Sequence, residues 1–262
     1  MPSVQEENTM DPNYVASLFD VRDKVIVITG GGGILCGTMS RGLAKAGARI
    51  AVLDIVFGAA QKVVDDIIAE GGVALAVHAD VLSKESLERS AEEVLARFGT
   101  VDALINGAGG NRREATTSPD LSFFDLPQDA IRWVFDLNFL GTVLSCQVYG
   151  KYLAERGEGV ILNIASLNAF RPLTKIPAYS AAKAAVKNFT EWLAVHISRN
   201  YSPKIRVNAI APGFFLTTQN RFLLFDEETG DYTPRGKTVV EHTPMDRFGD
   251  PEELMSTVLW LL

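Results

Sequence analysis

Hydrophobic positions along the chain follow two alternating patterns. Short runs that are apolar throughout, such as residues 24–29 and 49–54, are typical of strands buried on both faces of a parallel sheet. Between such runs, segments such as 39–47 carry apolar residues at intervals of three or four, which predicts amphipathic helices. Strands that alternate with helices in this way indicate a parallel sheet covered by helices on both faces.

The patterns predict six strands and five helices. The strands are expected at 24–29, 49–54, 73–80, 101–107, 159–166 and 204–213. The helices are expected at 39–47, 59–72, 84–99, 127–156 and 177–200. No internal linker, repeat or low-complexity tract interrupts the series. We therefore predict one α/β domain with a Rossmann-like, doubly wound parallel sheet.

Three segments lie outside this regular alternation. Residues 1–20 form a polar leader, so the domain itself is expected at 21–262. Residues 213–245 show no regular pattern, and their apolar and aromatic content favours a loop that covers a substrate. The apolar segment that ends at Leu262 has no helix cap after it, which indicates a further segment.

Composition and charge exclude several classes of function. The net charge of -7 argues against nucleic acid or an anionic membrane surface as the main partner. No apolar run approaches the roughly 20 residues that span a bilayer, and the start of the chain has no secretory signal, so we expect a cytoplasmic protein. Two cysteines and three scattered histidines do not match metal-ligand spacing, so no metal is expected.

A run of four glycines follows the first predicted strand, in the sequence TGGGGILCG from Thr29 to Gly37. Such a loop either cradles a phosphate or simply turns the chain. Its glycines depart from the pattern T-G-x-x-x-G-x-G, because Ile34 and Cys36 occupy the later glycine places. Glycines stand instead at Gly33 and Gly37, so the loop alone does not decide between the two readings.

Asp54 ends the second predicted strand, 24 residues after Gly30. A dinucleotide-binding fold places at this point the carboxylate that hydrogen-bonds the adenosine ribose hydroxyls. The same carboxylate repels a 2′-phosphate, which predicts NAD as the cofactor. The alternative is an aspartate that starts a turn after a strand.

Tyr179 and Lys183 lie four residues apart on a predicted helix, hence on one face of it. A phenol is a poor acid or base at neutral pH, and a nearby ammonium lowers its pKa by stabilising the phenolate. Ser166, 13 residues before Tyr179, ends the fifth predicted strand, where its hydroxyl could hold a substrate oxygen. Taken singly, these residues are more often surface packing or a turn.

Together, these features resemble the short-chain dehydrogenase/reductase family over nearly the whole chain. The matching elements, in the order of that family, are Thr29 and Gly30, Asp54, ADV at 79–81, NGAG at 106–109, Asn138, Ser166, YSAAK at 179–183, and APG at 211–213.

This resemblance implies a role for each matching residue. Tyr179 would be the acid and base, Lys183 would lower its pKa and bind the nicotinamide ribose, Ser166 would hold the reacting oxygen, and Asn138 would hold a water that relays protons. The glycine loop would bind the pyrophosphate, and Cys36 is expected to be a packing residue. The implied cofactor contacts are Gly30, Gly33, Ile34, Leu35, Asp54, Asp80, Val81, Asn106, Ala108, Gly109, Tyr179, Lys183, Pro212 and Gly213.

Amide and guanidinium groups gather in the segments after the last three strands. They suit a polyhydroxylated acid, because arginine grips a carboxylate in a fork. The candidate substrate contacts are Asn111, Arg112, Ser166, Asn168, Arg171, Asn220 and Arg221. We expect at least one of Arg112 and Arg113 to be merely solvated.

Phrases such as APGFFLTTQNRFLLFD and HTPMDRFGDPEEL are similar to the D-mannonate oxidoreductase (fructuronate reductase) branch of the family. That similarity implies NADH-dependent reduction of D-fructuronate to D-mannonate by a homotetramer. One rival is a reductase of another polyol, keto-acid or 3-oxoacyl substrate. A second rival is a nucleotide-binding regulatory protein without catalysis, which would have no need of Ser166, Tyr179 and Lys183 together.

Overall fold

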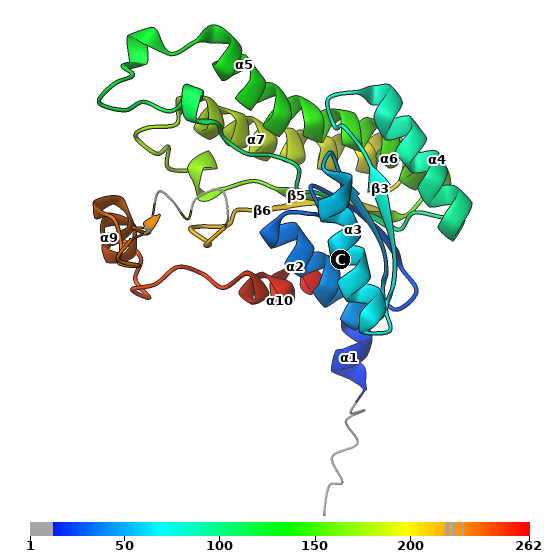
Figure 1. The fold of residues 1–262 in the computed structure, drawn as a ribbon. Helices are drawn as coiled ribbons and strands as arrows, with labels where there is room; N and C mark the ends of the chain where they lie inside the picture. Colours follow the sequence, from blue (N-terminus) through cyan, green and yellow to red (C-terminus); the bar gives the residue numbers. More distant parts are fainter. Residues whose placement is uncertain (1–12, 218–220, 222–223, 227) are drawn as a thin grey trace, which may run out of the picture.

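The computed structural model describes residues 13–217, 221, 224–226 and 228–262. Its centre is a parallel sheet of six strands in the order β3-β2-β1-β4-β5-β6 (Figure 1). The strands are β1 (Val25–Thr29), β2 (Arg49–Asp54), β3 (Val73–His78), β4 (Ala103–Asn106), β5 (Gly159–Ile164) and β6 (Ile205–Ile210). This arrangement confirms the predicted single α/β domain with a Rossmann-like sheet.

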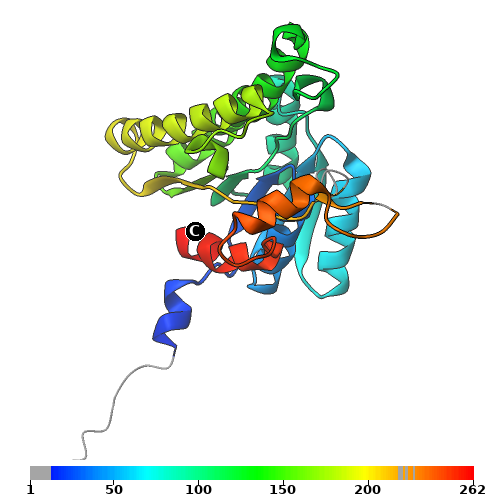
Figure 2. The same ribbon diagram turned by 90° about the vertical axis from the view of Figure 1, so that its left-hand side faces the viewer.

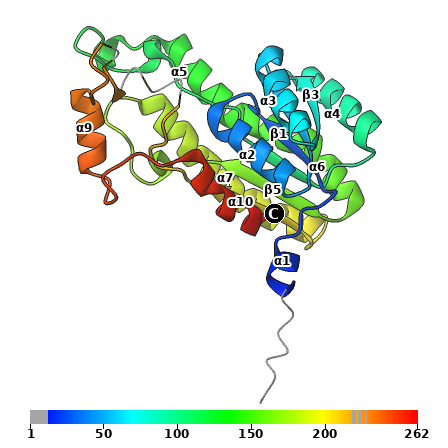
Figure 3. The same ribbon diagram turned by 60° about the horizontal axis from the view of Figure 1, so that its bottom comes forward.

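Helices cover both faces of the sheet (Figures 1 and 3). One face carries α2 (Ile34–Lys45), α3 (Phe57–Ala69) and α10 (Met255–Leu261). The other carries α4 (Lys84–Phe98), α5 (Gln128–Phe135), α6 (Gly141–Arg156) and α7 (Pro177–Asn200). The short helix α1 (Tyr14–Leu18) has no buried residue and leads away from the body of the domain (Figure 2).

Alternate side chains of the central strands enter two separate cores. Ile26 and Ile28 of β1 pack toward α2 and α3, whereas Val25 and Val27 pack toward α4 and α6. All of β1 is buried, which explains why its sequence is continuously apolar. Full burial of one such side chain contributes about 1.5–3 kcal/mol, so the two cores fix the register of the sheet.

The carboxyl ends of the central strands are level with one another. Thr29 at the end of β1 is in register with Leu53 of β2 on one side and with Asn106 of β4 on the other. The chain runs outward from β1 to β3 and then crosses back to β4, so the loops after β1 and β4 diverge at this point. Open α/β sheets bind their ligands at such a switch point.

Two sequence expectations need correction. The stretch 213–245 is not wholly irregular, because it contains the helix α9 (Pro234–Glu241), capped by Thr233, whose side chain accepts from the Gly236 amide. The predicted helix 39–47 begins earlier, at Ile34, because the chain turns helical directly after Gly33. The segment 127–156 is helical as predicted, but a π-helical turn, η3 (Asp136–Leu140), joins α5 to α6.

Short 3₁₀ turns complete the chain. They are η1 (Arg113–Ala115), η2 (Phe123–Asp125), η4 (Leu167–Ala169) and η5 (Pro251–Leu254). Two of them, η1 and η4, follow β4 and β5 and therefore lie at the carboxyl edge of the sheet. No helix in the part of the chain that the structure describes is long and apolar enough to cross a membrane.

Candidate active site

Ser166, Tyr179 and Lys183 meet where β5 and α7 come together. Pro177 occupies the first turn of α7, where its missing N–H costs nothing, and this fixes Tyr179 near the start of the helix. Ser166 follows β5 and caps η4, since its hydroxyl accepts the Asn168 amide at 3.2 Å. The Ser166 hydroxyl also hydrogen-bonds the Tyr179 phenol. The sequence prediction that these side chains form one cluster agrees with this geometry.

Burial controls the acidity of the Tyr179 phenol. Removal from water raises its pKa above the usual value of 10, and the hydrogen bond with Ser166 acts in the opposite direction. The shift is opposite to the one expected from the sequence, in which Lys183 lowers this pKa. The reason is geometric: the Lys183 Nζ lies 5.6 Å from the centre of the Tyr179 ring and donates its hydrogen bond elsewhere, to the Ile164 carbonyl.

Lys183 is buried, with only 5% of its surface exposed. Its ammonium donates to the Ile164 carbonyl at 2.7 Å, which orients the side chain beneath the end of β5. Burial lowers the pKa of Lys183 from 10.5 to about 8, and Cys36 acts in the opposite direction. The amine therefore changes its charge much nearer to neutral pH than an exposed lysine does.

Asn138 is locked in the π-helical turn η3. Its Oδ1 accepts the Gly110 amide at 3.1 Å, and its Nδ2 donates to the carbonyls of Gly110 and Val134, both at 2.7 Å. Gly109 passes so close that a Cβ there would lie 2.6 Å from Asn138 Oδ1 and 3.4 Å from Lys183 Nζ. Asn138, Gly109 and Lys183 thus share one small volume, whereas the water-relay role of Asn138 stays a prediction.

The glycine loop combines a left-handed glycine, a close backbone approach and an uncapped helix start. Gly30 has φ of +64°, and a Cβ there would lie 2.8 Å from the backbone of Ala108. Gly33 is the N-cap of α2, and no side chain caps the helix, so the first amides of Ile34 and Leu35 are available to an anion. Thr29 accepts the Gly107 and Ala108 amides and so ties the two loops together.

Cys36 explains the displaced glycines. Its side chain is buried and packs against Gly107, where a Cβ would come within 2.0 Å of the Cys36 sulfur. Burial raises the pKa of the Cys36 thiol to about 12, so it is not a reactive thiolate. The structure confirms that Cys36 is a packing residue. Where the usual pattern has a glycine at position 36, this chain has Cys36, and the glycine that permits the close contact is Gly107.

Asp54 is half-buried at the end of β2. Its Oδ2 accepts the Gly32 amide at 3.0 Å, and its Oδ1 accepts the Val56 amide at 2.9 Å. The carboxylate therefore connects the glycine loop to the start of α3. This is the position expected for a group that meets the adenosine ribose, and it also accounts for the turn after β2.

The remaining predicted cofactor contacts lie along the same edge of the sheet. Asp80 accepts the Leu82 amide at 2.9 Å, and Val81 is buried against Gly141. Pro212 accepts the Leu167 amide at 3.0 Å, and Gly213 follows it on an exposed part of the chain. Their contacts with a nucleotide remain predictions.

Asn106 belongs to a buried polar chain that sequence reasoning missed. Its Nδ2 donates to Asn163 Oδ1 at 2.8 Å and to the Cys146 sulfur at 3.1 Å, while its Oδ1 is buried without a hydrogen-bond partner. Asn163 Nδ2 in turn donates to Thr190 at 2.9 Å. The available signal was the polar Asn163 inside the apolar run VILNI, because buried polar groups require partners.

The predicted substrate contacts lie on several different segments of the chain. Asn168 is buried beside Ser166, and Asn111 lies in the loop after β4 with its Nδ2 on Thr116 at 2.8 Å. Arg171 is exposed in the segment before α7. Arg221 is exposed and stands over the Phe225 ring, 5.3 Å from its centre, and Asn220 lies outside the described residues.

Arg112 has a different partner from the one expected. Its guanidinium lies over the Trp133 ring, 4.2 Å from the centre, and its Nε is 3.8 Å from Glu114. The proposed grip on a substrate carboxylate therefore competes with contacts inside the protein. Arg113 is exposed, as expected for at least one of this pair.

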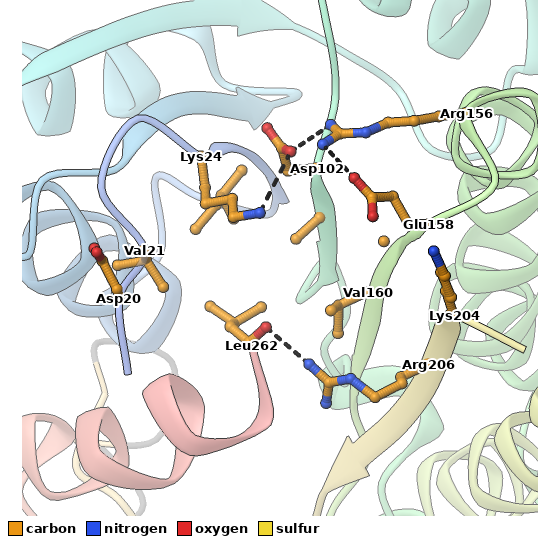
Figure 4. Close-up of a pocket in the computed structure, with 13 residues that line it drawn as sticks. Asp20, Val21, Lys24, Asp102, Arg156, Glu158, Val160, Lys204, Arg206 and Leu262 are labelled. Carbon is orange, nitrogen blue, oxygen red and sulfur yellow. Dashed lines mark hydrogen bonds and ion pairs between the residues drawn. The ribbon is translucent and has the colours of Figure 1, made fainter. Parts of the chain in front are cut away.

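A separate cavity of about 180 Å³ lies at the opposite, amino-terminal edge of the sheet (Figure 4). Asp102 occupies its wall, accepts the Val25 amide at 2.8 Å and pairs with Arg156. Arg206 donates to the carbonyls of Leu261 and Leu262. These contacts hold structural elements together, and none of the predicted site residues lines this cavity, so we place the active site at the carboxyl edge.

Comparison with known proteins agrees with this geometry. Residues 24–227 match the family model for short chain dehydrogenase. The uncharacterized oxidoreductase UxuB of Bacillus subtilis is 48% identical over 91% of this chain and 87% of its own length. The 5-keto-D-gluconate 5-reductase of Escherichia coli is 31% identical over 93% of this chain and 90% of its own length.

A solved structure is similar over the same region. It comes from Haemophilus influenzae, is provisionally assigned as a D-mannonate oxidoreductase and contains bound NAD. It is 46% identical to this chain, covers 94% of it and 90% of its own chain, and superposes with a TM-score of 0.86. The chain belongs to the short-chain dehydrogenase/reductase family. It is accordingly an oxidoreductase that uses a nicotinamide nucleotide and acts on CH–OH groups.

Proposed function

We propose that this protein interconverts a sugar acid and its keto form with NAD(H), and that D-mannonate and D-fructuronate are the pair. The observation that carries the proposal is the cluster of Ser166, Tyr179 and Lys183 beside the cradle formed by the glycine loop. The similar structure with bound NAD and the 5-keto-D-gluconate reductase support a sugar-acid substrate.

The side chains of the cluster divide the proton chemistry between them. In the reducing direction the bound NADH supplies a hydride to the carbonyl carbon. Tyr179 donates its phenolic proton to the carbonyl oxygen, so that the ketone becomes a secondary alcohol. Ser166, already hydrogen-bonded to the phenol, holds the same oxygen. Lys183, whose ammonium is held by the Ile164 carbonyl and lies 5.6 Å from the centre of the Tyr179 ring, is proposed to bind the nicotinamide ribose.

We also propose NAD(H) rather than NADP(H) as the cofactor. Asp54 places a carboxylate at the end of β2, where a 2′-phosphate would meet like charge. Asp54→Ala should narrow the preference for NADH over NADPH without abolishing turnover, and the ratio of the two kcat/KM values measures this. Equal use of NADPH by the native protein would show that Asp54 does not meet the ribose.

We further propose a homotetramer, as the family resemblance implies. From the sequence pattern we propose a cytoplasmic protein with a polar leader at 1–20 and the enzyme domain at 21–262. Within that domain, the region 213–245 is proposed to cover the substrate. Light scattering on the purified protein would measure the number of subunits.

The decisive experiment for the reaction is a substrate panel. The native protein is incubated with NADH and, separately, with D-fructuronate, 5-ketogluconate and an acetoacetyl thioester, and the loss of NADH absorbance is followed. We expect the highest kcat/KM with D-fructuronate. Turnover of the thioester alone would contradict the sugar-acid proposal. NADH binding without turnover of any compound would favour the regulatory alternative.

A further inference from the structure

We propose that Arg112 and Trp133 are positioning residues for the reaction, which hold the segment 110–117 against Tyr179. This inference rests on the proposed oxidoreductase function. The segment joins β4 to the part of the chain before α5, and it touches the site through both its ends and its middle. It will be called the β4 loop.

Both ends of the β4 loop are attached to the site. At the first end, Gly110 exchanges two hydrogen bonds with the Asn138 side chain, at 3.1 and 2.7 Å. At the second end, the Thr117 amide donates to the Lys175 carbonyl at 2.9 Å, in the segment that leads into α7. The β4 loop is therefore a bridge between η3 and the start of the helix that carries Tyr179.

The middle of the β4 loop belongs to the apolar cluster against which the half-buried Tyr179 packs. Ala115 is fully buried and forms one apolar cluster with Ala130 and Val134 of α5 and with Ala178, and the Tyr179 ring packs against this cluster. The wall around Tyr179 is therefore built partly from the β4 loop. A shift of the β4 loop would open this wall and admit water to the phenol.

The stack of Arg112 on Trp133 holds the outer side of the β4 loop. The guanidinium is 4.2 Å from the ring centre, a distance at which a planar cation is attracted to an aromatic face. Inside the β4 loop, Asn111 donates to Thr116, and Thr116 donates to the Arg112 carbonyl at 3.0 Å. The backbone of Arg112 is thus part of the folded β4 loop, while its side chain fastens that loop to α5.

This arrangement assigns Arg112 a task other than substrate binding. A residue that grips the substrate should change KM when it is removed. A residue that positions the acid should chiefly change kcat, because small displacements of a reacting group are costly. The two roles can therefore be separated by kinetics.

The dependence of kcat on pH gives a second test, in which the direction of the change is also predicted. The polar groups near Tyr179 are the Ser166 hydroxyl and the Lys183 ammonium, and Tyr179 also packs against the apolar cluster that contains Ala115. Burial raises the pKa of Tyr179, so admission of water should lower it toward 10. Reduction needs the protonated phenol, so the high-pH decline of kcat should move to lower pH when the stack is lost.

The test compares Trp133→Leu and Arg112→Ala with two matched variants. Trp133→Phe keeps an aromatic face and should retain most of the native kcat. Arg97→Ala removes a comparable arginine from above an aromatic ring, Phe98 at the end of α4, and should behave as native. Trp133→Leu and Arg112→Ala should lose on the order of tenfold in kcat, with NADH affinity unchanged.

Hydrogen exchange of the β4 loop and absorbance titration of the tyrosines complete the test, because neither requires turnover. We expect faster exchange at 110–117 and an earlier phenol titration in both disruptive variants. Native exchange with native kcat in Trp133→Leu would overturn the inference, as would an increase confined to KM in Arg112→Ala. If the native protein turns over no substrate, the proposed function fails, and exchange and titration alone decide on the positioning role.

Discussion

At the scale of single residues, burial governs the two ionisable groups of the site in opposite directions. It raises the pKa of the acid Tyr179 and lowers the pKa of the base Lys183, because each neutral form is favoured away from water. Both groups thus resist charging inside the protein. A substrate and a nucleotide that bind here would therefore meet two groups whose neutral forms are favoured by burial.

Tyr179→Phe removes the transferable proton and keeps the ring. We expect kcat to fall by ~10²–10⁴-fold, the usual contribution of a general acid or base. NADH affinity, measured by fluorescence, should stay close to that of the native protein. Tyr201→Phe, which changes an exposed tyrosine just after α7, is the control. Near-native turnover of Tyr179→Phe would remove the basis for the assigned roles of Ser166 and Asn138.

Lys183 should leave a signature in stability as a function of pH. Its folded pKa of about 8 lies below its unfolded value, so between pH 8 and 10.5 the unfolded chain holds a proton that the folded chain has lost. The stability of the native protein should therefore rise across this window relative to Lys183→Met. The expected gain from pH 8 to 9.5 is on the order of 1–2 kcal/mol.

Urea unfolding at the two pH values measures this difference. Lys187→Met is the matched control, because Lys187 lies one turn further along α7 and pairs with Glu191 at 2.6 Å near the surface. A parallel pH dependence for the native protein and Lys183→Met would show that the buried amine keeps an ordinary pKa.

Single residues were predictable from sequence where their spacing is local. Tyr179 and Lys183 share one helix face, and Ser166 lies just after the strand β5, so their meeting follows from the fold. The partner of Arg112 was not predictable, because Trp133 lies on another element and nothing in the local sequence marks it. An arginine near a site looks the same in sequence whether it contacts a ligand or a ring.

At the scale of elements, the contact between α2 and the loop after β4 fixes how closely the helix approaches the site. Cys36 of α2 and Gly107 are in contact at a distance that leaves no space for a second side chain. The inner strands β1, β2, β4 and β5 were predictable because each is a largely buried apolar run. The start of α2 was not, because glycines dominate the preceding loop and hide the point where the helix begins.

Gly107→Ala should destabilise the protein by about 1–3 kcal/mol, because the new methyl group would overlap the Cys36 sulfur. Adding Cys36→Gly should recover part of the loss by removing that sulfur. Gly58→Ala is the control, since nothing beyond its chain neighbours and the backbone of its own helix lies within 4 Å of the Cβ position. Thermal or urea unfolding of the single and double variants checks the prediction. No recovery in the double variant would mean that another contact limits this position.

The helix α9 shows why an element can escape prediction. Of its eight residues only Gly236 is buried, against the Leu224 carbonyl, so the sequence carries no apolar stripe. Its start was nevertheless marked by Thr233 followed by Pro234, a common way to begin a helix. The capping residues marked where α9 begins. Without an apolar stripe after them, nothing in the sequence indicated that a helix follows.

At the scale of the whole molecule, ligand binding at the switch point should stabilise the entire domain. Here the loops that follow the paired strands β1 and β4 diverge, so a nucleotide at this edge would contact both halves of the sheet. NADH at about 100 times its Kd should add about 2.7 kcal/mol to the free energy of unfolding. That corresponds to a rise of roughly 5–10 °C in Tm.

Differential scanning fluorimetry with NADH and NADPH measures this effect. NADPH at the same concentration should give a smaller shift, and Asp54→Ala should bring the two shifts closer together. The same rise with both nucleotides in the native protein would contradict the proposed preference.

The double attachment of Asp54 has a consequence for how the cofactor preference can change. Its two oxygens hold the Gly32 and Val56 amides, so the group proposed to choose the nucleotide also ties down the loop that receives it. A substitution made to admit a 2′-phosphate frees both amides at once. A change in cofactor preference at this position therefore also weakens the hydrogen bonding of the glycine loop. A homologue that evolves to use NADP(H) must gain new hydrogen bonds for that loop as well as a positive charge for the 2′-phosphate.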